Sequence, residues 1–261
     1  MKKILTFALL LMGAAVLRAQ EPVKEIHDED SDIRGRVAAE VDWKAFKGFH
    51  VYASEELRLD ENFSHVDRLH GTLGASYKIN RHLKTELEYN PIVDFKTGKA
   101  DQWRHRIAYG LTGNLKWSQF KFSLREKIQV TRKMDDKNPY QEPKWKAALR
   151  SRLKVSYDFH TRWEPYMSVE LRHYLNSPDW TWDAAGNTVY GGYSDAYMDR
   201  VRAEAGVEYA FSKDHRLEIY VMYDRCYEKE YDSKRKKPVL KTVWFHTGNY
   251  LTLGLAYKFK L

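Results

Sequence analysis

Apolar and polar residues alternate along most of the chain with a period of two. In the segment 33–44 the odd positions are mostly apolar, as at Ile33, Val37 and Val41, whereas the even positions are mostly charged. This alternation predicts a β-strand with one apolar face, because successive side chains of a strand point to opposite sides. The predicted strands are 33–44, 49–59, 69–79, 83–89, 103–117, 120–130, 145–157, 163–175, 201–211, 217–223 and 251–261.

Short and long connections alternate between these strands. Short polar turns occupy 45–48, 80–82, 118–119, 158–162 and 212–216, and longer loops occupy 60–67, 90–102, 131–144, 176–200 and 224–250. Short turns on one rim and long loops on the other are typical of outer-membrane β-barrels, whose short turns face the periplasm. Aromatic residues gather near both sets of connections, as in the belts found at membrane interfaces. They are Trp43, Phe46, Phe49, Trp117, Phe120, Phe159, Trp163 and Phe211 near the turns, and Tyr89, Trp103, Trp145, Tyr223 and Trp244 near the loops.

These patterns predict an all-β fold, a single antiparallel transmembrane up-and-down β-barrel of about 12 strands (10–12) over residues 33–261. A soluble sandwich or lipocalin-like barrel would also alternate, with its apolar parity facing an internal core. Strand segments of about ten residues and aromatics at strand ends favour the membrane barrel. Bacterial barrels usually have an even number of strands, so residues 20–32 either supply a twelfth strand, thread the lumen as a plug, or form a disordered acidic leader.

The N-terminus has the features of an export signal. Lys2 and Lys3 precede an apolar run over 4–17, and Ala19 is a small residue before the predicted cleavage site. The alternative, a membrane anchor, needs about 20 apolar residues, and this run is shorter. We therefore expect residues 1–19 to be a signal peptide cleaved after Ala19. The exported chain has one cysteine, Cys226, and so no internal disulfide.

Composition narrows the function classes further. The mean hydropathy of −0.68 excludes a bundle of transmembrane helices. The 261 residues include 44 Lys and Arg against 36 Asp and Glu, and the signal peptide accounts for three of the basic residues. The remaining basic bias is too weak to imply nucleic-acid binding.

Several segments resemble the uncharacterised outer-membrane barrels of Bacteroidetes that are grouped as domain of unknown function 2490. The resemblance covers about 33–261 and is carried by the Trp43 strand, 57–69, Trp103-Arg104-His105-Arg106, Leu124-Arg125-Glu126-Lys127 and Tyr257-Lys258-Phe259. It implies a barrel in the bacterial outer membrane, in contact with the lipid bilayer and lipopolysaccharide, and it implies no activity. The last strand, with Phe259 two residues before the terminal Leu261, also resembles the signal read by the barrel-assembly machinery.

The polar parity would line the lumen if the apolar parity faces lipid. Three successive strands then contribute an inward basic arc: Arg104, Arg106, Lys121, Arg125, Lys127, Lys146, Arg150, Arg152 and Lys154. Acids with inward parity lie on other strands, at Glu86, Glu88, Glu170, Glu204 and Glu208. One interpretation is a pore whose positive wall favours anions. A barrel of this strand number is narrow, so we expect the other interpretation, an interior closed by salt bridges.

Other candidate sites are weaker. Trp180, Trp182, Tyr190 and Tyr193 form a candidate extracellular ligand loop, which would stack on a sugar or, as we expect, close over the barrel mouth as a lid. The basic run 234–237 would neutralise lipopolysaccharide phosphates. Ser64-His65, His105 and His173 form no recognisable catalytic set, and no metal or cofactor motif occurs.

The expected function is therefore that of a structural or interaction barrel with a largely closed interior. A small anion-preferring channel or transporter is the alternative, and an outer-membrane lipid-modifying enzyme is the second alternative. The oligomeric state is left open.

Overall fold

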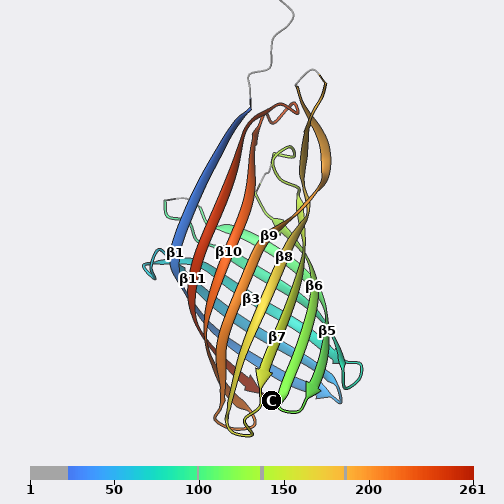
Figure 1. The fold of residues 1–261 in the computed structure, drawn as a ribbon, viewed down its shortest axis with the longest axis vertical. Helices are drawn as coiled ribbons and strands as arrows, with labels where there is room; N and C mark the ends of the chain where they lie inside the picture. Colours follow the sequence, from blue (N-terminus) through green and yellow to red (C-terminus); the bar gives the residue numbers. More distant parts are fainter. Residues whose placement is uncertain (1–22, 99, 136–137, 185–186) are drawn as a thin grey trace, which may run out of the picture.

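The computed structural model describes residues 23–98, 100–135, 138–184 and 187–261, and it confirms an all-β barrel (Figure 1). In this described part of the chain, no helix is long and apolar enough to cross a membrane. The predicted signal peptide, 1–19, lies outside the described residues. The strands are β1 (Lys24–Phe46), β2 (Phe49–Asp60), β3 (His65–Lys78), β4 (Leu83–Asp94), β5 (Gln102–Trp117), β6 (Phe120–Lys133), β7 (Trp145–Tyr157), β8 (Trp163–Trp182), β9 (Thr188–Ala210), β10 (His215–Ser233) and β11 (Leu240–Lys260).

The barrel closes with an odd number of strands. Each strand pairs with its neighbours in chain order, and β1 pairs with β11 to complete the ring. Ten of the pairs are antiparallel, but β1 and β11 are parallel, from Lys24 opposite Thr242 to Asp42 opposite Lys260. The parallel pair follows from the count, because the first and last of eleven successively reversing strands must run in the same direction. Eleven strands lie within the predicted range of 10–12, and the parallel β1–β11 pair corrects only the prediction that every pair is antiparallel.

The predicted acidic leader, 20–32, is neither a separate strand nor a lumen plug where the structure describes it. Lys24–Asp32 is the first part of β1 and pairs with Thr242–Tyr250 of β11. The acids of this segment have partners on the neighbouring strand: His246 Nδ1 lies 2.5 Å from Asp28 Oδ1, and Asn249 Nδ2 donates to Glu29 at 2.7 Å. Acidic residues are poor strand formers by propensity alone, and here the ladder to β11 outweighs that preference.

One side of the barrel is taller than the other. Strands β1 and β8–β11 continue well beyond the ends of β2–β7, so that they form a wall above one rim (Figure 1). Two predicted loops, 176–200 and 224–250, are therefore mostly strand, and only 183–187 and 234–239 connect strands there. The hydrophobic alternation stops at the base of this wall, whereas backbone pairing continues. For that reason, the wall strands predicted from side-chain periodicity are shorter than the strands in the structure.

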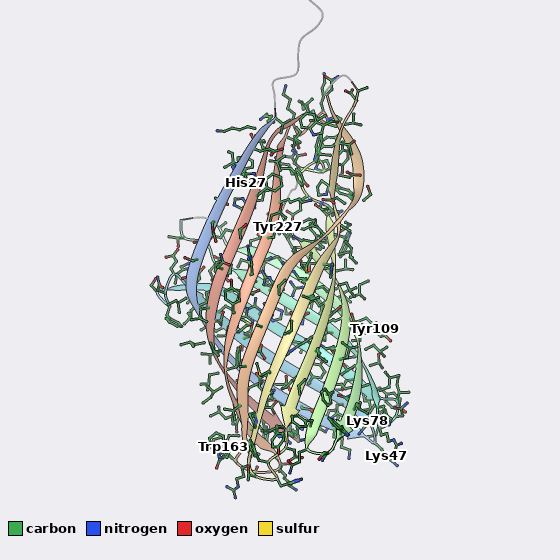
Figure 2. All side chains as sticks on the ribbon, in the orientation of Figure 1. His27, Lys47, Lys78, Tyr109, Trp163 and Tyr227 are labelled. Atoms are coloured by element: carbon green, nitrogen blue, oxygen red, sulfur yellow. The ribbon has the colours of Figure 1, made fainter. Side chains whose placement is uncertain are left out.

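The two faces of the barrel wall have opposite character. Along β4, Leu87 is 56% exposed and faces outward, whereas the neighbouring Glu86 is 7% exposed and faces the lumen. The same contrast holds around the ring, so the outside is apolar and the interior is polar, the reverse of a soluble β-barrel. Figure 2 places Lys47, Lys78 and Trp163 at the end that carries the short turns, and His27 on the tall wall at the other end.

Two tyrosines fill space above glycines on neighbouring strands. Tyr220 lies directly opposite Gly254, and a Cβ at Gly254 would overlap the Tyr220 ring. Tyr52 covers Gly74 in the same way and donates to Glu88 Oε1 at 2.8 Å. Glycine is required at these two positions because any side chain would displace an aromatic ring from the lumen wall.

We expect Gly254→Ala to lower the free energy of unfolding by about 1–3 kcal/mol, the usual cost of overpacking a filled site. Gly113→Ala is the matched control, because the nearest atom to its added Cβ is the Leu124 carbonyl oxygen at 3.9 Å. Urea titration followed by tryptophan fluorescence measures both variants. Equal stability of the two would contradict the close approach of Tyr220 to Gly254.

Candidate functional site

The barrel encloses a cavity of about 470 Å³ that is strongly basic. Sixteen Arg and Lys side chains and five Glu side chains line it. The basic residues are Arg36, Arg58, Arg68, Arg104, Arg106, Arg125, Lys127, Lys133, Lys146, Arg150, Arg152, Lys154, Arg172, Arg200, Arg202 and Lys258. They come from nine strands, β1–β3, β5–β9 and β11, so the positive charge surrounds the lumen and is not restricted to one arc. We call this space the central cavity.

Eight of the nine residues of the predicted basic arc line the central cavity. Lys121 is the exception and lies near the short-turn rim, where its Nζ is 2.7 Å from Glu164 and 3.4 Å from Asp158. The His160 backbone N–H and the Lys121 ammonium hold the pKa of Asp158 below its ordinary value. Lys121 is therefore a rim residue with acidic partners of its own.

Acids with inward parity neutralise much of the arc. Lys127 Nζ lies 2.7 Å from Glu86 and 2.8 Å from Glu88. Arg152 contacts Glu204 at 2.6 Å, and Lys154 contacts Glu208 at 2.9 Å. Each of these pairs spans an intervening strand, a separation of about 10 Å at a strand spacing of about 4.8 Å. Long basic side chains cover that separation, which is how acids two strands away become partners.

Glu170 is shared by three arginines. Arg150 donates to it at 2.7 Å, Arg202 at 3.3 Å and Arg125 at 3.5 Å, from strands β7, β9 and β6. Glu170 itself is only 4% exposed. A buried carboxylate is stable when several charge-assisted hydrogen bonds satisfy it, and Glu170 therefore connects one side of the interior into a single network.

Several members of the network were not predicted. Asp94 pairs with Arg68 and Arg104, Asp199 with Arg172, and Asp224 with Arg200 and Arg202. The predicted basic arc comes from three strands only, and the predicted inward acids do not include Asp94, Asp199 or Asp224. Inward parity was the available signal, but Asp199, Arg200 and Asp224 lie at the edges of segments taken as loops.

Arg106 differs from the other arginines of the cavity. Its Nε donates to Thr131 Oγ1 at 3.0 Å, and no carboxylate of the described residues lies within 4.0 Å of it. It is half-buried and faces the central cavity. Arg58, Arg68, Arg150 and Arg172 line the same cavity, and each of them has a carboxylate partner. The interior charge is therefore incompletely compensated at this position.

The predicted aromatic ligand loop is the tip of the β8–β9 hairpin. Trp180 donates to the Tyr140 carbonyl oxygen at 3.3 Å, and the hydroxyls of Tyr190 and Tyr193 donate to the Pro139 carbonyl oxygen. These three side chains thus hold the β6–β7 connection against the hairpin, and the lid over the barrel mouth stays a prediction. Trp182 is 57% exposed and remains on the surface.

The residues considered for catalysis do not assemble into a reactive group. Ser64 donates to the Glu61 carbonyl oxygen and His65 contacts Asp60, so the two side chains have separate partners. His105 Nδ1 lies 2.6 Å from the Tyr89 hydroxyl on the outer face. Within the described ranges, no group of three or more His, Cys, Asp or Glu residues is arranged to hold a metal ion.

Comparison with known families agrees with the resemblance found in the sequence. A model of the family described as "Protein of unknown function (DUF2490)" matches residues 37–235, which include β2–β10 and the last ten residues of β1. No curated protein matches the chain.

We expect Glu170→Gln to destabilise the barrel by about 3–5 kcal/mol, the range seen when one partner of a buried ion pair is removed. Arg125, Arg150 and Arg202 would lose their shared counter-charge. Glu61→Gln, at an exposed turn position, is the control and should leave stability within about 0.5 kcal/mol. Chemical unfolding of both variants checks this, and a Glu170→Gln variant as stable as wild type would rule out the shared role of Glu170.

Proposed function

The chain belongs to the DUF2490 family, and we propose that it is an outer-membrane β-barrel with a structural or interaction role whose lumen is closed by salt bridges. The observation that carries this proposal is the inverted distribution of polarity. Charged side chains such as Glu170 and Asp199 are buried inside, and large apolar side chains are exposed outside. No catalytic role is part of the proposal.

A bilayer is the environment that suits the outer face. Exposed Leu, Ile, Val and Met side chains cover it on most strands, including Leu73, Ile107, Leu153, Met167 and Leu253. An apolar surface that surrounds the whole barrel far exceeds the patches found on soluble monomers. Exposed aromatics such as Trp117 and Trp163 near the short turns and Trp103 and Trp145 toward the other rim fit two interfacial belts.

The proposed orientation places the short turns in the periplasm and the tall wall outside the cell. Short periplasmic turns and longer extracellular segments are the usual arrangement of such barrels. The expected signal peptide and the assembly signal near Phe259 agree with export to the outer membrane. On the outer side, 234–237 would then lie beside lipopolysaccharide phosphates.

A closed lumen follows from the size of the barrel and its contents. Eleven strands enclose a narrow interior, well below the sixteen or more strands of barrels with an aqueous channel. Pairs such as Lys127 with Glu86 and Arg152 with Glu204 extend long side chains into that space. The remaining volume is the central cavity, which the proposal treats as a space that does not continue through the barrel as a pore.

Single-channel recording of the refolded protein in planar bilayers tests the closed lumen. We expect no steady conductance. The lining bases without a carboxylate partner among the described residues, Arg106 and Lys146, favour the second candidate, a small anion-preferring channel. A steady current with anion selectivity would establish that candidate and reject the closed barrel.

Substitutions at two outward positions on adjacent strands test the bilayer placement, because one should destabilise the folded barrel and the other should stabilise it. Leu153→Arg should cost about 2–4 kcal/mol on folding into lipid vesicles, as charged residues near the midplane do. Glu126 is an acid on the same face, where its carboxylate accepts a hydrogen bond from Ser151 at 2.6 Å. Glu126→Leu should stabilise the folded barrel in vesicles, because it removes a carboxylate from the lipid face.

Folding equilibria in vesicles of phosphatidylcholine measure both variants. An exposed site in water would give the reverse pattern, in which Leu153→Arg is tolerated and Glu126→Leu is neutral or unfavourable. That reverse pattern would reject the membrane placement while leaving the barrel fold intact.

A further inference from the structure

The central cavity holds more positive charge than its own acids neutralise. Arg106 has no carboxylate partner among the described residues, and four other arginines, Arg58, Arg68, Arg150 and Arg172, line the same cavity. Lys146 also has no carboxylate within 4.0 Å in the described ranges, and its Nζ lies over the Tyr174 ring at 4.0 Å. Like charges enclosed in a narrow lumen raise the free energy of the folded state unless a counter-charge is present.

Donor groups in the same region lack protein acceptors. The Nε–H groups of Arg104, Arg200 and Arg202 are buried without a hydrogen-bond partner in the structure. All three side chains line the central cavity. Buried donors are nearly always satisfied in folded proteins. The hydrogen-bonding capacity of these arginines is therefore not used up by the protein, and oxygen atoms of an anion are the matching acceptors for guanidinium groups.

A second cavity adjoins the central cavity on the tall-wall side. Its volume is about 240 Å³, and it shares Arg36, Arg58, Arg68, Arg200 and Glu228 with the central cavity. Its other lining residues include His246, Gly248 and Tyr250, at the base of the β11 extension. We take this second cavity as the route by which a solute would reach Arg106. The sheet separates this route from the apolar outer face, which disfavours a lipid headgroup as the ligand.

We infer that the central cavity binds a soluble multivalent oxyanion, such as a phosphate or pyrophosphate group, with Arg106 as its main contact. Guanidinium groups present paired donors that match the oxygens of phosphate, whereas a monovalent halide uses only their charge. Arg58, Arg150 and Arg172 surround the same space from β2, β7 and β8, so a ligand with several oxygens contacts more than one wall. This inference concerns the lumen alone and holds whether or not the barrel conducts.

The test uses the full mature chain in a neutral detergent and inorganic pyrophosphate as the probe. Calorimetric titration should show saturable binding of pyrophosphate to wild type, and none of chloride at the same ionic strength. Arg106→Gln should weaken binding by about tenfold or more, because it removes a charge-assisted hydrogen bond. Arg216→Gln is the matched control: Arg216 lies outside the central cavity, 3.6 Å from Glu208, and its loss should leave binding unchanged.

A second measurement separates ligand contact from structural support. In low salt without pyrophosphate, Arg106→Gln should unfold at the same temperature as wild type or higher, because it relieves repulsion among the arginines. Added pyrophosphate should raise the unfolding temperature of wild type but not of the variant. Equal effects of pyrophosphate and chloride on wild type, or equal binding by the Arg106→Gln and Arg216→Gln variants, would overturn the inference. The wild-type comparison decides the question even if the variant does not fold.

Discussion

Charge compensation inside a narrow barrel is the constraint on which the rest of this structure depends. A strand with period two must direct one set of side chains inward, and here that set is charged. Burying charges is costly unless each has a partner with good geometry. The strands meet this requirement jointly, because acids such as Glu170 and Glu204 neutralise arginines from neighbouring strands and from strands one further away. The fold and the interior network therefore specify one another.

The odd number of strands makes the two ends of the barrel different. The parallel pair of β1 and β11 allows both strands to rise above one rim together with β8–β10. Ion pairs of Lys121, Lys154 and Lys258 lie toward the short-turn end, at 2.7–2.9 Å from their glutamates. The second cavity extends toward the tall wall. The two ends of the interior therefore differ: ion pairs lie toward the short turns, and a second cavity lies toward the tall wall.

Much of this architecture was readable from the sequence. Alternation places Arg104, Arg125 and Arg150 on the inward face, and eight of the nine predicted arc residues line one cavity. Sequence periodicity could not show which acid meets which base, because partners such as Lys127 and Glu88 lie 39 positions apart and skip a strand. Hydrophobic alternation also predicts strand ends too early, so it assigns the paired but polar segments of β8–β11 to loops. The sequence does not predict Lys24–Asp32 as part of the first strand for a related reason. Its strand conformation depends on pairing with β11 and not on its own composition.

A double-mutant cycle on Arg152 and Glu204 measures the central claim most directly, because their 2.6 Å contact crosses an intervening strand. Unfolding free energies of Arg152→Gln, Glu204→Gln and the double variant give the coupling between the two side chains. Interior compensation predicts a favourable coupling of about 1–3 kcal/mol, as found for residues in one ion-pair network. A coupling within about 0.5 kcal/mol of zero, the additivity of independent sites, would mean that water and not opposite charge satisfies the interior, and would contradict this account.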